Sequence, residues 1–185
     1  MDRTSSFQFA TMALISHTYS TPLGEMLAVF SENGLCLLEF VGQERLDREL
    51  QQVQAARGGV LRAGENALTA RLGRQLRDYF AGQRRDFDVP LDLVGTDFQQ
   101  SVWRSLLQIP YGETWSYAQQ AERVGRPTAV RAVANANGSN KISIVVPCHR
   151  VIGSNGKLTG YGGGLARKEG LLALEARAGQ QRAAA

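Results

Sequence analysis

The sequence predicts two domains of different class, a mixed α/β domain followed by a mostly helical one. Strand and turn signals dominate the first 40 residues, whereas helix-capping signals dominate after residue 96. Residues 1–95 hold 10 Lys/Arg and 12 Asp/Glu, a net −2, and residues 96–185 hold 11 and 5, a net +6. We therefore place the domains at residues 1–92 and 93–185. A basic domain suits a polyanionic partner, although an ordinary solvated surface would show the same charge.

The first domain opens with three predicted strands at residues 14–20, 24–30 and 34–40. Turn residues separate them, which indicates an antiparallel meander with one covered face. Cys36 falls in the third strand and is interpreted as a small core hydrophobe. Next come a polar helix, a short strand, an amphipathic helix and an extended linker with an edge strand, at residues 43–56, 60–63, 66–82 and 84–95.

The second domain begins with a capping box, because Thr96 is followed three residues later by Gln99. We expect this helix to run through Gln108. Ser116 and Gln119 repeat the pattern and predict a short second helix.

A glycine-containing turn at 125–127 and a helix over 128–137 complete a helix-turn-helix pattern. Many helical hairpins share this pattern, so it leaves DNA binding open. Arg123, Arg126 and Arg131 lie on or beside it and favour DNA.

Composition excludes several classes of protein. Apolar residues make up 43% and charged residues 21%, as in a globular chain. No apolar run reaches the 18 or so residues of a membrane span, and the first 20 residues do not resemble a signal peptide. The two cysteines form no CxxC pair. We expect a cytoplasmic protein with reduced thiols, no metal site and no cofactor.

The stretch SIVVPCHRVIG, residues 143–153, places Cys148 and His149 after an apolar run that ends at Pro147. We interpret the run as a buried strand that the proline ends, leaving the thiol on the floor of a pocket. A thiol attacks as thiolate and needs a base or a positive neighbour. Adjacent side chains of an extended chain point to opposite faces, so a water between Cys148 and His149 is the easier geometry.

A carboxylate should orient His149 and stabilise its imidazolium form. The second domain has five acidic residues, and Glu175 is the one on an otherwise apolar helical stretch, residues 165–179. It is either a surface residue at the end of a helix or a buried partner, and its spacing alone favours the surface.

The segments PCHRVIG (147–153) and GYGGGLARKE (160–169), with a helix-turn-helix that begins at Tyr117, resemble the O6-alkylguanine-DNA alkyltransferases. The resemblance covers residues 96–177 closely and 21–82 more loosely. It implies a ribonuclease-H-like first domain and a helical second domain that carries the reactive cysteine. It also implies direct-reversal DNA repair, in which an alkyl group leaves O6 of a flipped guanine, with O4-alkylthymine as a second substrate left open. Alkyl transfer makes a thioether with no exit route, so each protein would act once.

The same resemblance implies roles for individual residues. Cys148 would accept the alkyl group, His149 would deprotonate it through a water, Glu175 would orient His149, and Asn140 would brace the segment before the cysteine. The substrate and DNA contacts would come from Tyr117 beside the flipped base, Arg131 as a finger filling the stack, the Val151 carbonyl, the Gly162 N–H, Tyr161 and Arg126. The partner would be double-stranded DNA with alkylated bases, bound by a monomer that can cluster along it.

Three features depart from the pattern of this family, and one of them is Gly170, which stands where relatives often have tryptophan. Lys141 stands where many relatives have proline, so we expect a looser bend before the active segment. The run Gly162–Gly164 lacks the side chains common in relatives, so we expect a wider pocket.

Three rival interpretations remain. A damage-binding relative that cannot react would lack the cysteine, which Cys148 argues against. A cysteine hydrolase would use Cys148 and His149, although adjacent residues are poorly placed for that. A helix-turn-helix regulator would carry an inert thiol.

Overall fold

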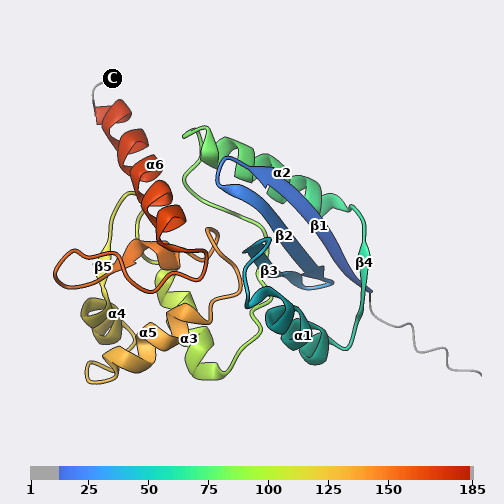
Figure 1. Cartoon of the computed structure of the whole chain (residues 1–185), viewed down its shortest axis with the longest axis horizontal. Coiled ribbons are helices and arrows are strands. Elements are labelled where there is room, and N and C mark those ends of the chain that lie inside the picture. Colours follow the sequence, from blue (N-terminus) through green and yellow to red (C-terminus); the bar gives the residue numbers. More distant parts are fainter. Residues whose placement is uncertain (1–12, 184–185) are drawn as a thin grey trace, which may run out of the picture.

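The computed structural model describes residues 13–183 and shows a sheet with helices beside a helical cluster (Figure 1). The segment in which we expect no signal peptide lies mostly outside these residues. The predicted elements of the first half are confirmed, apart from the edge strand of the linker. They are β1 (Ala13–Thr21), β2 (Gly24–Ser31), β3 (Gly34–Phe40), α1 (Leu46–Arg57), β4 (Val60–Ala63) and α2 (Ala67–Phe80).

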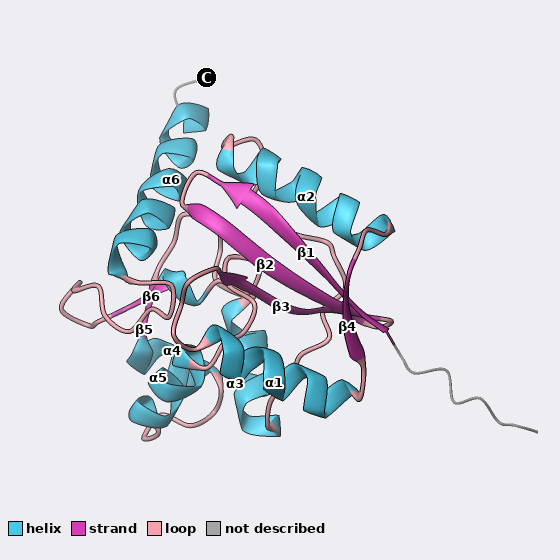
Figure 2. Ribbon diagram, turned by 45° about the vertical axis from the view of Figure 1, so that its right-hand side comes forward, coloured by secondary structure: helices cyan, strands magenta, loops and turns pink. Residues whose placement is uncertain are grey.

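The meander is confirmed and gains a fourth strand. β1 pairs antiparallel with β2 and β2 with β3, while β4 pairs parallel with β1, which gives the order β3-β2-β1-β4. The return through α1 brings β4 to the far edge. Helix α1 lies on one face of the sheet and α2 on the other (Figure 2).

Both faces of the sheet are covered, which corrects the expectation of one covered face. Val29, Cys36 and Leu37 pack with Val53 of α1. The opposite face packs against α2 and against residues of the second domain, so the largest core runs through both halves of the chain. Every residue of β3 is buried as a result.

The linker between the domains runs along the edge of the sheet. The expected edge strand is reduced to a bridge between Leu35 and Leu91, with hydrogen bonds from Leu35 N to Pro90 O at 2.8 Å and from Asp92 N to Leu35 O at 2.9 Å. Gly34 permits this approach, because its φ is +147° and a Cβ there would overlap the Pro90 carbonyl.

The second half contains the predicted helices. Its elements are α3 (Asp97–Leu106), β5 (Trp115–Ser116), α4 (Tyr117–Arg123), α5 (Val130–Gly138), the 3₁₀ turn η1 (Cys148–Arg150), β6 (Val151–Ile152) and α6 (Leu165–Ala183). Both capping boxes are confirmed, since the Thr96 and Ser116 hydroxyls each accept from the N3 backbone N–H, and their own backbone N–H groups donate to the side-chain oxygen of the N3 glutamine. A small core of Val102, Ala121, Val133 and Ala136 holds α3, α4 and α5 together.

The apolar run before Pro147 is not a strand. Residues 143–145 form a turn in which Val146 N donates to Ile142 O at 3.0 Å, and Ile144 has a φ of +71°. A β-branched residue in this region is strained and persists only where its surroundings fix it. Apolar composition suggested a strand, but side-chain hydrogen bonds from Asn140 stabilise the turn.

Within residues 13–183, no helix is both long and apolar enough to cross a membrane.

Candidate active site

Asn140 organises the turn that precedes the cysteine. It follows α5 and is 1% exposed. Its Oδ1 accepts from Ile142 N at 3.0 Å, and its Nδ2 lies 2.9 Å from Val146 O and 3.2 Å from Cys148 Sγ. One amide therefore contacts both ends of the turn and the thiol itself.

The same segment is attached to the sheet of the first domain. Leu38 N donates to Lys141 O and Ser143 N donates to Leu38 O, both at 2.8 Å. Ser143 Oγ also donates to the buried carboxylate of Glu39 at 3.1 Å. These bonds fix the backbone at Lys141, and the looser bend relative to proline-bearing proteins stays a prediction.

Cys148 is 7% exposed in η1. Burial raises the pKa of its thiol, as does the charge of Glu39, while the Asn140 hydrogen bond and the charges of Arg45 and Lys168 oppose the rise. The thiol is therefore neutral at rest and needs a base, while Asn140, Arg45 and Lys168 offset part of the cost of forming the thiolate.

His149 and Glu175 form a fully buried pair. His149 Nε2 lies 2.8 Å from Glu175 Oε1, and both residues are 0% exposed. The surface position that spacing favoured for Glu175 is wrong, because α6 points this residue into the core between the domains. The other ring nitrogen, His149 Nδ1, is buried and has no hydrogen-bond partner among the described residues.

Other groups complete the shell of Glu175. Arg150 donates through Nε at 2.9 Å and through a second nitrogen at 3.1 Å. The Tyr79 hydroxyl donates at 2.7 Å and Gly112 N at 3.0 Å. A buried carboxylate is stable when its lone pairs are satisfied in this way.

Burial would raise the pKa of Glu175, but hydrogen bonds and charge from His149 and Arg150 outweigh it and lower the pKa. Burial also lowers the pKa of His149, against the opposing pull of Glu175. Arg150 supplies the countercharge that keeps the carboxylate ionised while the imidazole is neutral. The histidine can therefore take a proton at Nδ1, and the imidazolium that forms is stabilised by Glu175.

The short pairing of β5 with β6 places the start of α4 beside the cysteine. Trp115 pairs with Val151 and Ser116 with Ile152, so Tyr117 follows directly. The Tyr117 hydroxyl donates to Thr159 O at 3.1 Å. It therefore lies against the glycine-rich loop over residues 153–164.

Lys168, which the sequence analysis did not single out, fixes this loop. It is 0% exposed, and its Nζ donates to Val151 O at 2.6 Å and Thr159 O at 2.7 Å. Lys168, Leu171 and Glu175 are all buried on α6. Their spacing of three and four residues puts them on one face, and this was the signal that could have identified Lys168.

The glycine run lies against side chains of the first domain. A Cβ at Gly162 would overlap the guanidinium of Arg45, and a Cβ at Gly163 would lie 2.6 Å from Tyr161 Cε1. Arg45 therefore fills the space that a side chain at Gly162 would occupy, and a pocket wider than in relatives stays a prediction. Tyr161 itself is 8% exposed, and its hydroxyl has no partner within the described part of the chain.

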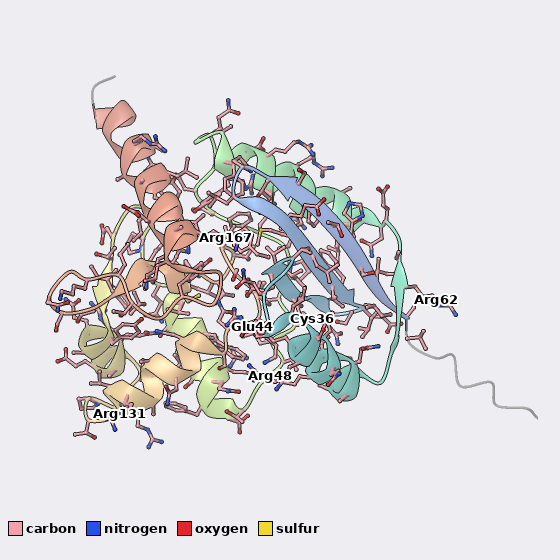
Figure 3. The ribbon with its side chains drawn as sticks, viewed as in Figure 1. Cys36, Glu44, Arg48, Arg62, Arg131 and Arg167 are labelled. Carbon is pink, nitrogen blue, oxygen red and sulfur yellow. The ribbon has the colours of Figure 1, made fainter. Side chains whose placement is uncertain are left out.

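Arg126 and Arg131 are not brought to the thiol. Both are exposed, Arg126 in the turn after α4 and Arg131 in the first turn of α5. Figure 3 shows Arg131 at the outer edge of the helical domain. A partner that lies across α4 and α5 would meet both arginines. The same partner would meet Tyr117, at the end of α4 nearest the cysteine.

Residues 13–183 contain no group of three or more His, Cys, Asp or Glu side chains placed to hold a metal ion. The arrangement is instead a buried thiol, a buried neutral imidazole and a carboxylate behind it, next to a helix-turn-helix. Such a set can transfer a group to sulfur.

Comparison with protein families gives two matches. Residues 14–93 match the ribonuclease-like domain of 6-O-methylguanine DNA methyltransferase, and residues 97–177 match its DNA binding domain.

Individual relatives carry related names. A methylated-DNA–protein-cysteine methyltransferase of Mycobacterium tuberculosis is 65% identical over 101 residues, which are 55% of this chain and 61% of the relative. The alignment thus spans less than two thirds of that relative's length. A protein of the same name from Methanosarcina acetivorans is 44% identical over 85% of this chain and 95% of its own length. A crystal structure titled M. tuberculosis OGT in complex with DNA matches with a TM-score of 0.77 at 44% identity, covering 89% of this chain and 94% of that chain.

Proposed function

Because this chain belongs to the 6-O-methylguanine DNA methyltransferase family, we propose that it repairs DNA by transferring one alkyl group from O6 of guanine to Cys148. The observation that carries the proposal is the contact set of Cys148. Its sulfur accepts from Asn140, and its neighbour His149 is backed by the buried Glu175. A helix-turn-helix leads directly into this site through Tyr117.

The reaction follows from these contacts. His149 Nδ1 takes the proton of the Cys148 thiol through a water, and Glu175 stabilises the imidazolium that forms. The sulfur then attacks the alkyl carbon, so that an S–C bond forms as the C–O6 bond breaks. The electron pair stays on guanine, which takes up a proton from solvent and leaves as the unmodified base. The Asn140 N–H and the charges of Arg45 and Lys168 favour the thiolate before it attacks.

Access to the thiol requires a flipped base, because O6 of guanine lies inside the duplex and Cys148 is buried. Tyr117 would lie by this base and Arg131 would fill the gap in the stack. The Val151 carbonyl would accept from the guanine amino group and the Gly162 N–H would face O6. Entry of the base must part the Tyr117 hydroxyl from Thr159, or move the loop that carries Thr159.

Asn140, through its contacts with the turn, would hold the thiol in line. Tyr161 and Arg126 would complete the contacts with the base and the DNA backbone. The product is a thioether, which water does not open, so each molecule acts once. We place this action in the cytoplasm, on double-stranded DNA, with a monomer as the reacting unit.

The test is intact-protein mass spectrometry after mixing with a duplex that carries one O6-methylguanine. We expect one added methyl group, mapped to Cys148 and never exceeding one per protein. A parallel duplex with O4-methylthymine decides whether that base is a second substrate.

Two outcomes would overturn the proposal. Unchanged mass together with tight binding to the lesion would indicate a damage sensor. Unchanged mass without binding, but with turnover of an ester or peptide substrate, would indicate a cysteine hydrolase.

A further inference from the structure

A cavity of about 580 Å³ lies between the domains, away from the thiol. It opens between α1 and the segment where α3 begins and α5 ends. Figure 3 shows Arg48 between α1 and the helices of the second domain. Its polar lining comes from both domains: Arg48, Glu49, Gln52, Gln99, Asn135 and Lys141.

Two ionisable side chains of this lining are buried without sufficient partners. Lys141 is 5% exposed, and its ammonium has no hydrogen-bond or ion-pair partner in the described part of the chain. The ammonium lies 5.3 Å from the centre of the Trp103 ring, which compensates its burial only in part. Glu49 is 3% exposed; its Oε1 lies 3.4 Å from Arg45 Nε, and its Oε2 has no described partner.

The charge around the cavity is positive in excess. Arg45, Lys141 and Arg48 lower the pKa of Glu49 and Glu39 raises it, but burial dominates and brings the pKa to about 7. Arg45 is already paired with Glu39. When Glu49 is protonated, Lys141 and Arg48 therefore remain as two cations with no matching anion.

We propose that this cavity binds a phosphate-type oxyanion, held between Lys141 and Arg48 with the Glu49 carboxyl as a third contact. An oxyanion would accept from the unpartnered ammonium and from the guanidinium. The protonated carboxyl would donate to it through the oxygen that now has no partner. Amides on the rim, such as Gln52 and Asn135, offer further donors.

An oxyanion at this position would also act on the segment that leads to the thiol. Lys141 follows Asn140, the residue that donates to Cys148 Sγ. Arg45, which also contacts Glu49, donates to Asn140 O at 3.2 Å. Occupancy would therefore fix the position of Asn140 from the opposite side of the chain.

The experiment uses sulfate as the probe, because sulfate does not titrate near neutral pH. The melting temperature of the full chain is measured against sulfate at constant ionic strength, at pH 6 and at pH 8. We expect a saturable rise, with affinity about tenfold higher at pH 6, since only protein with Glu49 protonated is competent and the pKa is about 7.

Variants separate this site from general anion effects. Arg48→Met and Lys141→Met should each weaken sulfate binding at least about tenfold, the loss of one charged contact. Lys141→Arg should retain binding. The matched control is Arg62→Met, an exposed arginine on β4 at the far edge of the sheet (Figure 3). Glu49→Gln should remove the difference between pH 6 and pH 8.

Several outcomes would overturn the proposal: no saturable rise at either pH, equal losses in Arg48→Met and Arg62→Met, or a pH dependence retained by Glu49→Gln.

A second experiment, with DNA present, identifies the source of the oxyanion. If it is a DNA phosphate, sulfate competes with DNA, and Arg48→Met lowers the salt slope of DNA binding by about one. If it is a free oxyanion, sulfate and DNA bind together and the slope is unchanged.

Discussion

The two cysteines of this chain are both buried, yet their surroundings differ in the direction of the hydrogen bond at sulfur. Cys36 Sγ lies 3.7 Å from Gly34 O and 3.6 Å from Asp92 Oδ2, so its thiol faces acceptors. Cys148 Sγ accepts from an N–H of Asn140 at 3.2 Å. Burial raises the pKa of both thiols. Burial alone therefore does not distinguish the two thiols, whereas the groups around each sulfur differ: Asp92 and Ser31 for Cys36, and Asn140 with two cations for Cys148.

The charges behind the two sulfurs differ in the same way. The carboxylate of Asp92 raises the pKa of Cys36, and Asp92 is itself held by Arg57 Nε at 2.7 Å. Cys148 lies in the field of Arg45 and Lys168, although Glu39 opposes them. The carboxylate of Glu175 contacts His149 and not the sulfur.

The largest expected effect comes from exchanging each sulfur for oxygen. Cys148→Ser should lower alkyl transfer by at least about 10⁴-fold, as when an enzyme loses its nucleophile. Cys36→Ser should stay within about twofold of the parent, because its hydroxyl can still donate to Asp92. Single-turnover transfer from an O6-methylguanine duplex measures both. Comparable losses in the two variants would mean that the comparison of the thiols is mistaken.

The next effect concerns the N–H that faces Cys148. Asn140→Ala removes the donor to the thiolate and two contacts within the turn, so we expect transfer to fall about 10²-fold. The matched control is Asn33→Ala, an exposed asparagine in the turn between β2 and β3. The measurement is the rate of reaction with free O6-benzylguanine, with circular dichroism to verify folding. A fully folded Asn140→Ala with the parent rate would show that the donor is dispensable.

Much of the fold could be predicted from local chemistry. The turns at residues 21–23 and 31–34 separate the strands of the sheet, and the capping boxes at Thr96 and Ser116 begin α3 and α4. These signals act within a few residues, which is why one sequence suffices to identify them.

The sequence was less informative where charged residues are buried. Glu39, Arg45 and Lys168 have the composition of surface positions, yet Glu39 and Lys168 are 0% exposed. The partners of Glu39 and Arg45 are remote in the chain: Ser143 contacts Glu39 across 104 positions, and Arg45 contacts Asn140 across 95. No periodicity reports such contacts. Glu175 shows the same difficulty, since its spacing alone favoured the surface.

A smaller effect separates delivery of the base from reaction of the thiol. Arg131 is exposed on α5 and has no described contact with the Cys148 site, so Arg131→Ala should leave the reaction with free O6-benzylguanine unchanged. Transfer from duplex DNA should fall by about tenfold, because a stacking contact contributes about 1–3 kcal/mol. Arg62→Ala is the control for loss of positive charge. Equal losses with the free base and the duplex would show that Arg131 does not fill the gap left in the base stack.

The smallest effect concerns pH, and it tests how Cys148 ionises. Burial lowers the pKa of His149, so the imidazole stays neutral and able to accept a proton from pH 8 down through pH 6.5, its usual pKa. Transfer from free O6-benzylguanine should change less than about twofold over that range and decline only below it. If the thiol ionised without His149, its raised pKa would make the rate fall about tenfold per pH unit on acidification. That steep profile is what a thiol with no neighbouring base would show. Its appearance at Cys148 would mean that His149 does not act as the base.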